Sequence, residues 1–140
     1  MLIQTDFPAH PLYAAVAAQD YTAFASEALD ERRTASFPPF SHLVLLRAES
    51  KKPGEAVDFL RTAVRSARAL AKDTKGGEVE IFDPVPAVLE RKAGFERAQL
   101  LVRSASRAAL HSFLPRWRDA LGRREERRVR WALDVDPQEV

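Results

Sequence analysis

Hydrophobic residues recur at two spacings along the chain, and the two spacings follow one another in a regular order after residue 40. Strand-like patterns occur at 41–50, 78–91, 95–104 and 129–135, and the last of these alternates apolar and polar residues most regularly. Apolar residues every three or four positions predict helices at 53–72 and 106–121. An Ala-Gly turn joins the second and third strands as a hairpin. The pattern predicts the order β-α-β-β-α-β.

This order is that of the ferredoxin-like split βαβ sandwich, in which a four-stranded sheet carries two helices on one face. We therefore expect an α+β fold. Pro84 and Pro86 interrupt the second strand. Because proline has no backbone N–H to give to a sheet, they favour an edge or bulged position for that strand. Ser106 is expected to cap the second helix.

The first forty residues have a different pattern. LIQT (2–5) is a short strand candidate, and helical spacing then runs from Pro11 to about Arg33, with a break that Asp20 can cap. Pro38 and Pro39 stop any helix. We expect a helical arm at 1–40 and an α/β domain at 41–140.

Composition limits the classes of protein that remain. The 140 residues suffice for one main domain with a single core. There is no cysteine, which excludes disulfides, thiolate zinc sites and cysteine nucleophiles and suits an intracellular protein. No apolar run approaches the roughly 18 residues of a membrane span. We expect no membrane association.

Charge is distributed unevenly. Residues 91–130 contain 12 Lys and Arg against 4 Asp and Glu, a balance of +8, whereas 1–90 and 131–140 each carry −3. Such a block predicts an anionic partner, and nucleic acid is the commonest large one. A solvated arginine-rich surface is the alternative.

Motifs for catalysis are few. The sequence has no phosphate-binding glycine loop, no serine elbow and no ligand spacing among its three histidines. Asp134 and Asp136, with Glu139 nearby, could hold a divalent cation in a small metal-dependent phosphodiesterase. Asp-Pro is also an ordinary end to a strand, and we favour that interpretation. We expect no catalytic residue and no metal ligand.

The arginines and lysines are more informative. Alternation in 95–104 places Arg97, Gln99 and Arg103 on one face of the strand. The residues expected to contact DNA are Arg91, Lys92, Arg97, Arg103, Arg124 and Arg128. Arg107 and His111 are one turn apart near a helix N-terminus, where the two side chains could receive a carboxylate. Solvated surface residues are again the alternative for this pair.

Several segments together resemble one known family. LIQT, ERR followed by FPPF, the run DPVPAVLER and the closing WALDVDP occur in an order and spacing that resemble the C-terminal part of the PriA family. This family, also called primosomal protein N-prime, comprises bacterial replication-restart DNA helicases. The resemblance covers nearly the whole chain.

The resemblance implies a fold and a place in a longer protein. LIQT resembles the last strand of the second helicase lobe, and the remainder resembles a C-terminal domain with the ribosomal S10 fold. No ATPase motif lies in these residues, so the fragment is expected not to be an enzyme and to need no cofactor. In the parent, an ATP-dependent 3′–5′ helicase, ATP and zinc are expected upstream.

The resemblance also implies partners. They are branched-fork and single-stranded DNA, the upstream helicase core, other primosome proteins and the acidic tail of single-stranded DNA-binding protein. Arg107 matches the family's basic position for that tail, and His111 stands where relatives can carry a glutamine. A bacterial cytoplasmic location follows. The alternative is a stand-alone protein-interaction domain whose basic block meets an acidic protein instead of DNA.

Overall fold

The chain divides into two compact units, Met1–Phe40 and Ser41–Val140. The computed structural model describes residues 2–123, 128–138 and 140, except for the side chains of residues 88, 89 and 91. The first unit ends at Phe40, the last residue of SFPPF.

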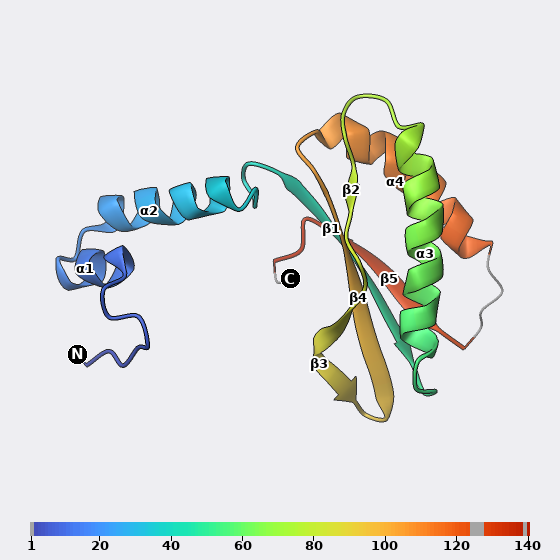
Figure 1. The fold of residues 1–140 in the computed structure, drawn as a ribbon, viewed down its shortest axis with the longest axis horizontal. Coiled ribbons are helices and arrows are strands. Elements are labelled where there is room, and N and C mark those ends of the chain that lie inside the picture. The colour runs from blue at the N-terminus through green and yellow to red at the C-terminus, as the bar shows by residue number, and fades with distance from the viewer. Residues whose placement is uncertain (1, 124–127, 139) are drawn as a thin grey trace. The chain divides into compact units, whose positions relative to one another are not determined.

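The first unit is a pair of helices, α1 (Pro11–Ala17) and α2 (Tyr21–Thr34), which pack against each other (Figure 1). The predicted break at Asp20 is confirmed, because its carboxylate caps α2. His10 caps α1 with Nδ1 and places Nε2 3.0 Å from Glu31 of α2. One side chain therefore connects the two helices.

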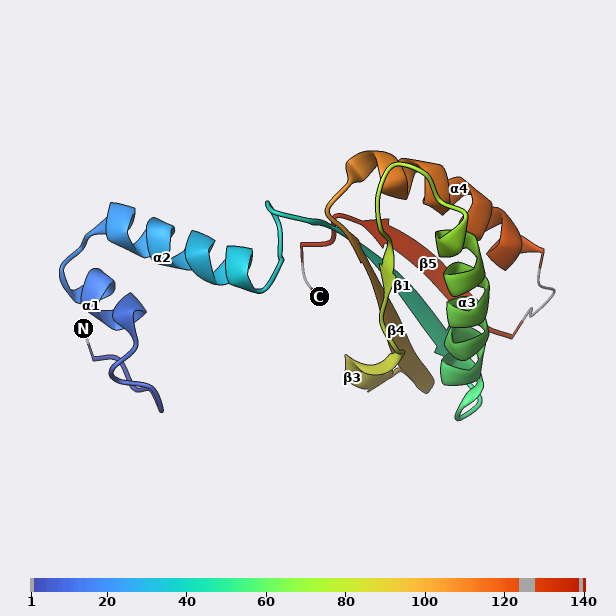
Figure 2. The same ribbon diagram turned by 45° about the horizontal axis from the view of Figure 1, so that its top comes forward.

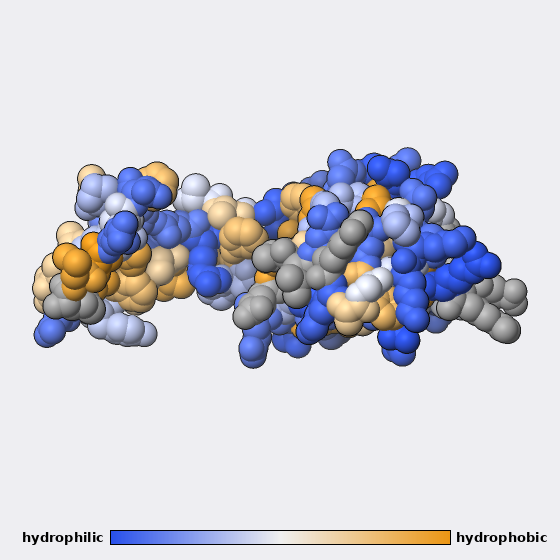
Figure 3. Space-filling view, turned by 90° about the horizontal axis from the view of Figure 1, so that it is seen from below, coloured by the Kyte–Doolittle hydropathy of each residue, from blue (hydrophilic) through white to orange (hydrophobic). Residues whose placement is uncertain are grey.

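The strand expected at 2–5 is not formed, and those residues have no regular secondary structure. A strand needs a neighbour for its backbone N–H and C=O groups, and no described strand pairs with this segment. Leu2, Phe7 and Tyr21 are largely exposed. Figure 3 shows hydrophobic side chains gathered on the surface of this unit. The unit therefore buries little of its own apolar surface.

The second unit confirms the predicted order of elements. It contains β1 (His42–Ser50), α3 (Glu55–Lys72), β2 (Glu80–Ile81), β3 (Val85–Lys92), β4 (Phe95–Ser104), α4 (Arg107–Gly122) and β5 (Arg130–Val135). The sheet order is β2-β4-β1-β5, with β3 also paired to β4, and every pairing is antiparallel. Helices α3 and α4 lie over the same face of the sheet (Figures 1 and 2). This is the α+β arrangement of a ferredoxin-like fold.

The segment predicted as one interrupted strand forms two short strands, β2 and β3, on the same side of β4. Phe82 and Pro84 lie between them, and the Phe82 N–H still bonds to the Leu101 carbonyl at 3.0 Å. The register of β3 shifts between Pro86 and Arg91. The prolines thus occupy the edge and bulged positions that their missing N–H groups favour.

The core lies between the sheet and the two helices. Alternate residues of β1 and β4 enter it: Val44, Leu46, Ala48, Ala98, Leu100 and Val102. Helix α4 contributes Phe113 and Trp117, whose rings lie 5.3 Å apart. The buried indole N–H of Trp117 donates to the Ala63 carbonyl of α3 at 3.2 Å, which satisfies the polar end of a large apolar side chain. From β5, Trp131 and Leu133, on the apolar side of its alternation, pack against this core.

Candidate anion-binding surfaces

The face of the sheet away from the helices carries the buried Leu43 and Leu45 in the first half of β1 and polar side chains in its second half and along β4. In β4, burial alternates strictly from Arg97 to Ser104, with Arg97, Gln99 and Arg103 on the less buried side. This is the face predicted for them. The register places Arg47 of β1 beside Gln99. Two residues along, the register places Glu49 between Arg97 and Arg130 of β5.

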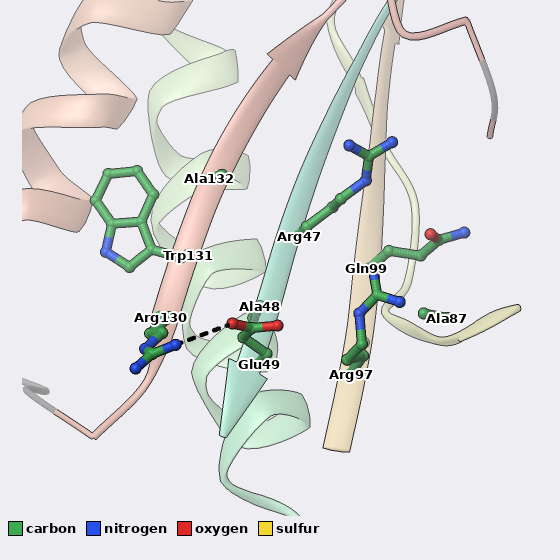
Figure 4. Close-up of a pocket in the computed structure, with 10 residues that line it drawn as sticks. Arg47, Ala48, Glu49, Ala87, Arg97, Gln99, Arg130, Trp131 and Ala132 are labelled. Atoms are coloured by element: carbon green, nitrogen blue, oxygen red, sulfur yellow. Dashed lines mark ion pairs between the residues drawn. The ribbon is translucent and has the colours of Figure 1, made fainter. Parts of the chain in front are cut away.

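A pocket of about 250 Å³ opens on this face, where β1, β4 and β5 run side by side (Figure 4). Arg47, Arg97, Gln99 and Arg130 line it, together with Glu49. Trp131 and four alanines, Ala48, Ala87, Ala98 and Ala132, complete the lining. The pocket therefore presents three guanidinium groups and one amide from three strands.

The three arginines differ in their partners. Arg47 lies 2.9 Å from the Asp134 carboxylate, and Arg130 lies 3.8 Å from Glu49. Within the described part of the chain, Arg97 has neither an ion pair nor a side-chain hydrogen bond. Its charge is the one that the pocket leaves uncompensated.

Arg103 lies at the other end of β4 and is strongly engaged. Its Nε donates to Glu80 at 2.7 Å, a second nitrogen lies 2.6 Å from the same oxygen, and its guanidinium lies 5.1 Å from the centre of the Phe82 ring. Only 22% of the side chain is exposed. Its charge is largely neutralised by Glu80, unlike that of Arg97.

The other residues expected to contact DNA are spread out. Lys92 is exposed at the end of β3, and the exposed Arg128 lies 4.0 Å from Glu55 at the start of α3. Arg124 lies outside the described residues, as does the side chain of Arg91. Arg97 and Arg103 are six residues apart on one strand, or about 20 Å. The described members of this set therefore do not form one compact site.

Arg107 and His111 occupy the exposed side of the first turns of α4, as predicted. Ser106 caps the helix by accepting the Ala109 N–H at 3.1 Å. The preceding loop fixes this end, because a Cβ added at Gly77 would lie 2.7 Å from the Ser106 Cβ. Only glycine allows so close an approach. The pair is held on a well-anchored helix start, open to a carboxylate.

Asp134 and Asp136 are the described members of the carboxylate group at 134–139. Asp134 is occupied by Arg47, whose positive charge would oppose a cation there. The strand ends at Val135, and Asp136 has a φ of 52°, so the alternation that would align the two aspartates stops between them. Among the described residues no group of three metal-ligating side chains occurs, and Glu139 lies outside them. These contacts favour the strand-end interpretation.

Sequence reasoning missed Arg47 and Arg130 as members of a site. Each lies on a strand whose alternation was visible, and that alternation could have placed both on the open face. It could not show that β1 lies between β4 and β5, because that pairing joins residues far apart in the sequence. The missing information was the order of the strands.

Two designed proteins of known structure are distantly similar to this chain. The de novo designed protein Foldit4 superposes with a TM-score of 0.47 at 9% identity, over 70% of this chain and 98% of that one. The designed protein LFR1 1, described as having a ferredoxin fold, superposes with a TM-score of 0.42 at 11% identity, over 72% of this chain and 88% of that one.

In the described part of the chain, no helix is both long and apolar enough to cross a bilayer.

Comparisons of sequence are more specific. The model of the primosomal protein N C-terminal domain matches residues 33–138. Replication restart protein PriA of Haemophilus influenzae is 33% identical over 140 residues, which are the whole of this chain and 18% of that protein. The PriA proteins of Synechocystis and Treponema pallidum are 32% and 31% identical, over 76% and 100% of this chain and 12% and 20% of their own length. The chain thus corresponds to a small part of these relatives, and it belongs to the family of primosomal protein N (PriA) C-terminal domains.

Proposed function

We propose that this chain is the DNA-binding and partner-docking domain of a bacterial, cytoplasmic replication-restart helicase that acts in the 3′–5′ direction. Membership of the PriA C-terminal domain family carries the proposal. The motor chemistry, with ATP and zinc, belongs to other parts of the longer protein. The role of this domain is to help grip branched or single-stranded DNA and to dock the helicase core and other primosome proteins.

The basic block supports the DNA-binding part of the proposal. Twelve Lys and Arg residues against four Asp and Glu lie between residues 91 and 130. Lys92, Arg97 and Arg128 present exposed or half-exposed cations from that block. Phosphate contacts of this kind release counterions from the nucleic acid, so affinity falls as salt rises.

Salt dependence is the test. Binding of a labelled single-stranded oligonucleotide to the 140-residue chain is measured by fluorescence anisotropy at several salt concentrations. The logarithm of the association constant should fall against the logarithm of salt concentration with a slope of about −0.7 for each phosphate neutralised. Absence of binding, or affinity that does not change with salt, would contradict the proposal. A protein-interaction domain that meets an acidic partner would then be the better description.

The partner-docking part rests on Arg107 and His111. Both side chains are exposed beside the capped N-terminus of α4. A guanidinium pairs well with a carboxylate, and the helix dipole adds positive potential at this end. We propose that the pair receives the acidic C-terminal tail of single-stranded DNA-binding protein. The helicase core is expected to complete this pocket in the longer protein.

A further inference from the structure

Among the described residues, one positive charge of the pocket on the open face of the sheet, that of Arg97, has no partner. Arg97 makes no ion pair within the described part of the chain. The side-chain amide of Gln99 lies on the same face of β4, two residues further along the strand. Arg47 keeps further N–H donors after its 2.9 Å pair with Asp134, because a guanidinium carries five. Figure 4 shows Arg47, Arg97 and Gln99 projecting on the same side of the strands.

We propose that this pocket binds a backbone phosphate of single-stranded DNA, with Arg97 as the principal cation and Arg47, Gln99 and Arg130 as further donors. The inference rests on the DNA-binding role proposed above and assigns one site to it. A phosphate has several acceptor oxygens, which suits donors that converge from three neighbouring strands.

One group in the pocket opposes an anion. Glu49 lies between Arg97 and Arg130 in the register, and its carboxylate is 3.8 Å from the Arg130 guanidinium. That distance exceeds the 2.7 to 2.9 Å or so of a strong charged hydrogen bond. Arg130 also lies 4.9 Å from the centre of the Phe95 ring. Arg130 is thus positioned by a ring and a loose ion pair, and it can turn to a phosphate.

An aromatic ring on the same face favours a single strand over a duplex. Phe82 is 38% exposed, and the Arg103 guanidinium lies 5.1 Å from the centre of its ring. Phe82 lies opposite Leu101, and Leu101 is two residues, or about 7 Å, from Gln99 along β4. An unpaired base can stack on such a ring, whereas the base faces in a duplex are already stacked on one another. A phosphate of a single strand would thus bind in the pocket, and a neighbouring base would stack on the Phe82 ring.

The experiment compares charge-matched variants of the 140-residue chain by anisotropy with a labelled oligothymidylate at one fixed salt concentration. Arg97→Ala should weaken binding about tenfold, the effect of losing charged hydrogen bonds. Arg65→Ala removes the same charge from the exposed side of α3 and should change affinity less than threefold or so, as a distant charge does. Glu49→Gln should tighten binding by up to about fivefold, because it removes the opposing carboxylate.

A second pair of measurements tests the preference for single strands. Phe82→Leu keeps an apolar side chain but loses the ring, and it should weaken oligothymidylate binding about tenfold while leaving duplex binding unchanged. Urea midpoints within error of the original chain would show that each variant is folded.

Three outcomes would overturn the inference or its basis, and they are distinguishable. If the original chain binds no DNA, the proposed function fails and the inference fails with it. If the original chain binds but Arg97→Ala and Arg65→Ala weaken it equally, the pocket assignment is wrong and the general DNA-binding role stands. If Phe82→Leu weakens duplex and single strand alike, the restriction to single strands is wrong.

Discussion

The two faces of the sheet are made by the same strands but differ most in charge, because the ion pairs of β1 and β5 lie on one face only. On the face that α3 and α4 cover, β1 and β4 contribute aliphatic side chains that are essentially without solvent exposure. On the other face, the first half of β1 contributes the buried Leu43 and Leu45, whereas its second half and β4 contribute Arg47, Glu49, Arg97 and Gln99, all partly exposed. Each charged residue of β1 and β5 on this face is paired with one from the neighbouring strand.

The difference between the faces suggests that the covered face contributes mainly to stability and the open face mainly to binding. Burying apolar surface is the main favourable contribution to folding, so the covered face should determine the free energy of unfolding. Exposed ion pairs contribute little to that free energy. The open face is therefore free to carry charges that serve binding. The three predictions below test this separation.

The largest expected effect comes from the covered face. Trp117→Ala removes a buried ring that packs on Phe113 and a hydrogen bond to Ala63, and it should lower the free energy of unfolding by about 3 to 5 kcal/mol. Urea unfolding followed by fluorescence measures this, because Trp131 on β5 remains as the reporter. Arg116→Ala, an exposed change one residue away, is the control and should shift the midpoint little. A small effect of Trp117→Ala would mean that the core repacks easily.

An intermediate effect is expected on the outer surface of the helical layer. Arg107→Ala in the longer protein should weaken binding of an acidic, carboxylate-terminated peptide by about 1.5 to 3 kcal/mol, the cost of a lost hydrogen bond to a charged group. Calorimetric titration measures it, and the unfolding midpoint should stay unchanged because the side chain is exposed. Arg116→Ala on the same helix is again the control. Unchanged peptide affinity would place the tail elsewhere.

The smallest effect belongs to the open face. A double-mutant cycle with Arg47→Ala and Asp134→Ala should give a coupling energy of about 0.2 to 1 kcal/mol, because the side chains are 43% and 39% exposed. Coupling is measured from the free energies of unfolding of the two single variants and the double variant. A coupling as large as the Trp117 effect would show that the open face also determines stability, and the separation of the two faces would fail.

A structural feature of this chain could be predicted from the sequence when it depends only on residues close together in the sequence. Helix starts at Asp20 and Ser106 and the alternation of β4 were predictable because each depends on neighbours in the sequence. The prediction of a strand at 2–5 is wrong, because these four residues carry no information about whether a partner strand exists. The pocket of Arg47, Arg97 and Arg130 was not predictable as a group, because it depends on which strands are adjacent in the sheet.

The strict alternation of β4 has a consequence for insertions and deletions. One residue inserted in the middle of β4 would move every side chain on one side of the insertion to the opposite face of the sheet. Either Arg97 would then point into the core or Val102 would point into solvent. β4 has pairing neighbours on both sides and cannot absorb the change. β3 pairs with β4 alone within the described sheet and already contains a register shift between Pro86 and Arg91. Among natural relatives, length changes should therefore gather in β3 and its connection to β2, while β4 keeps its length.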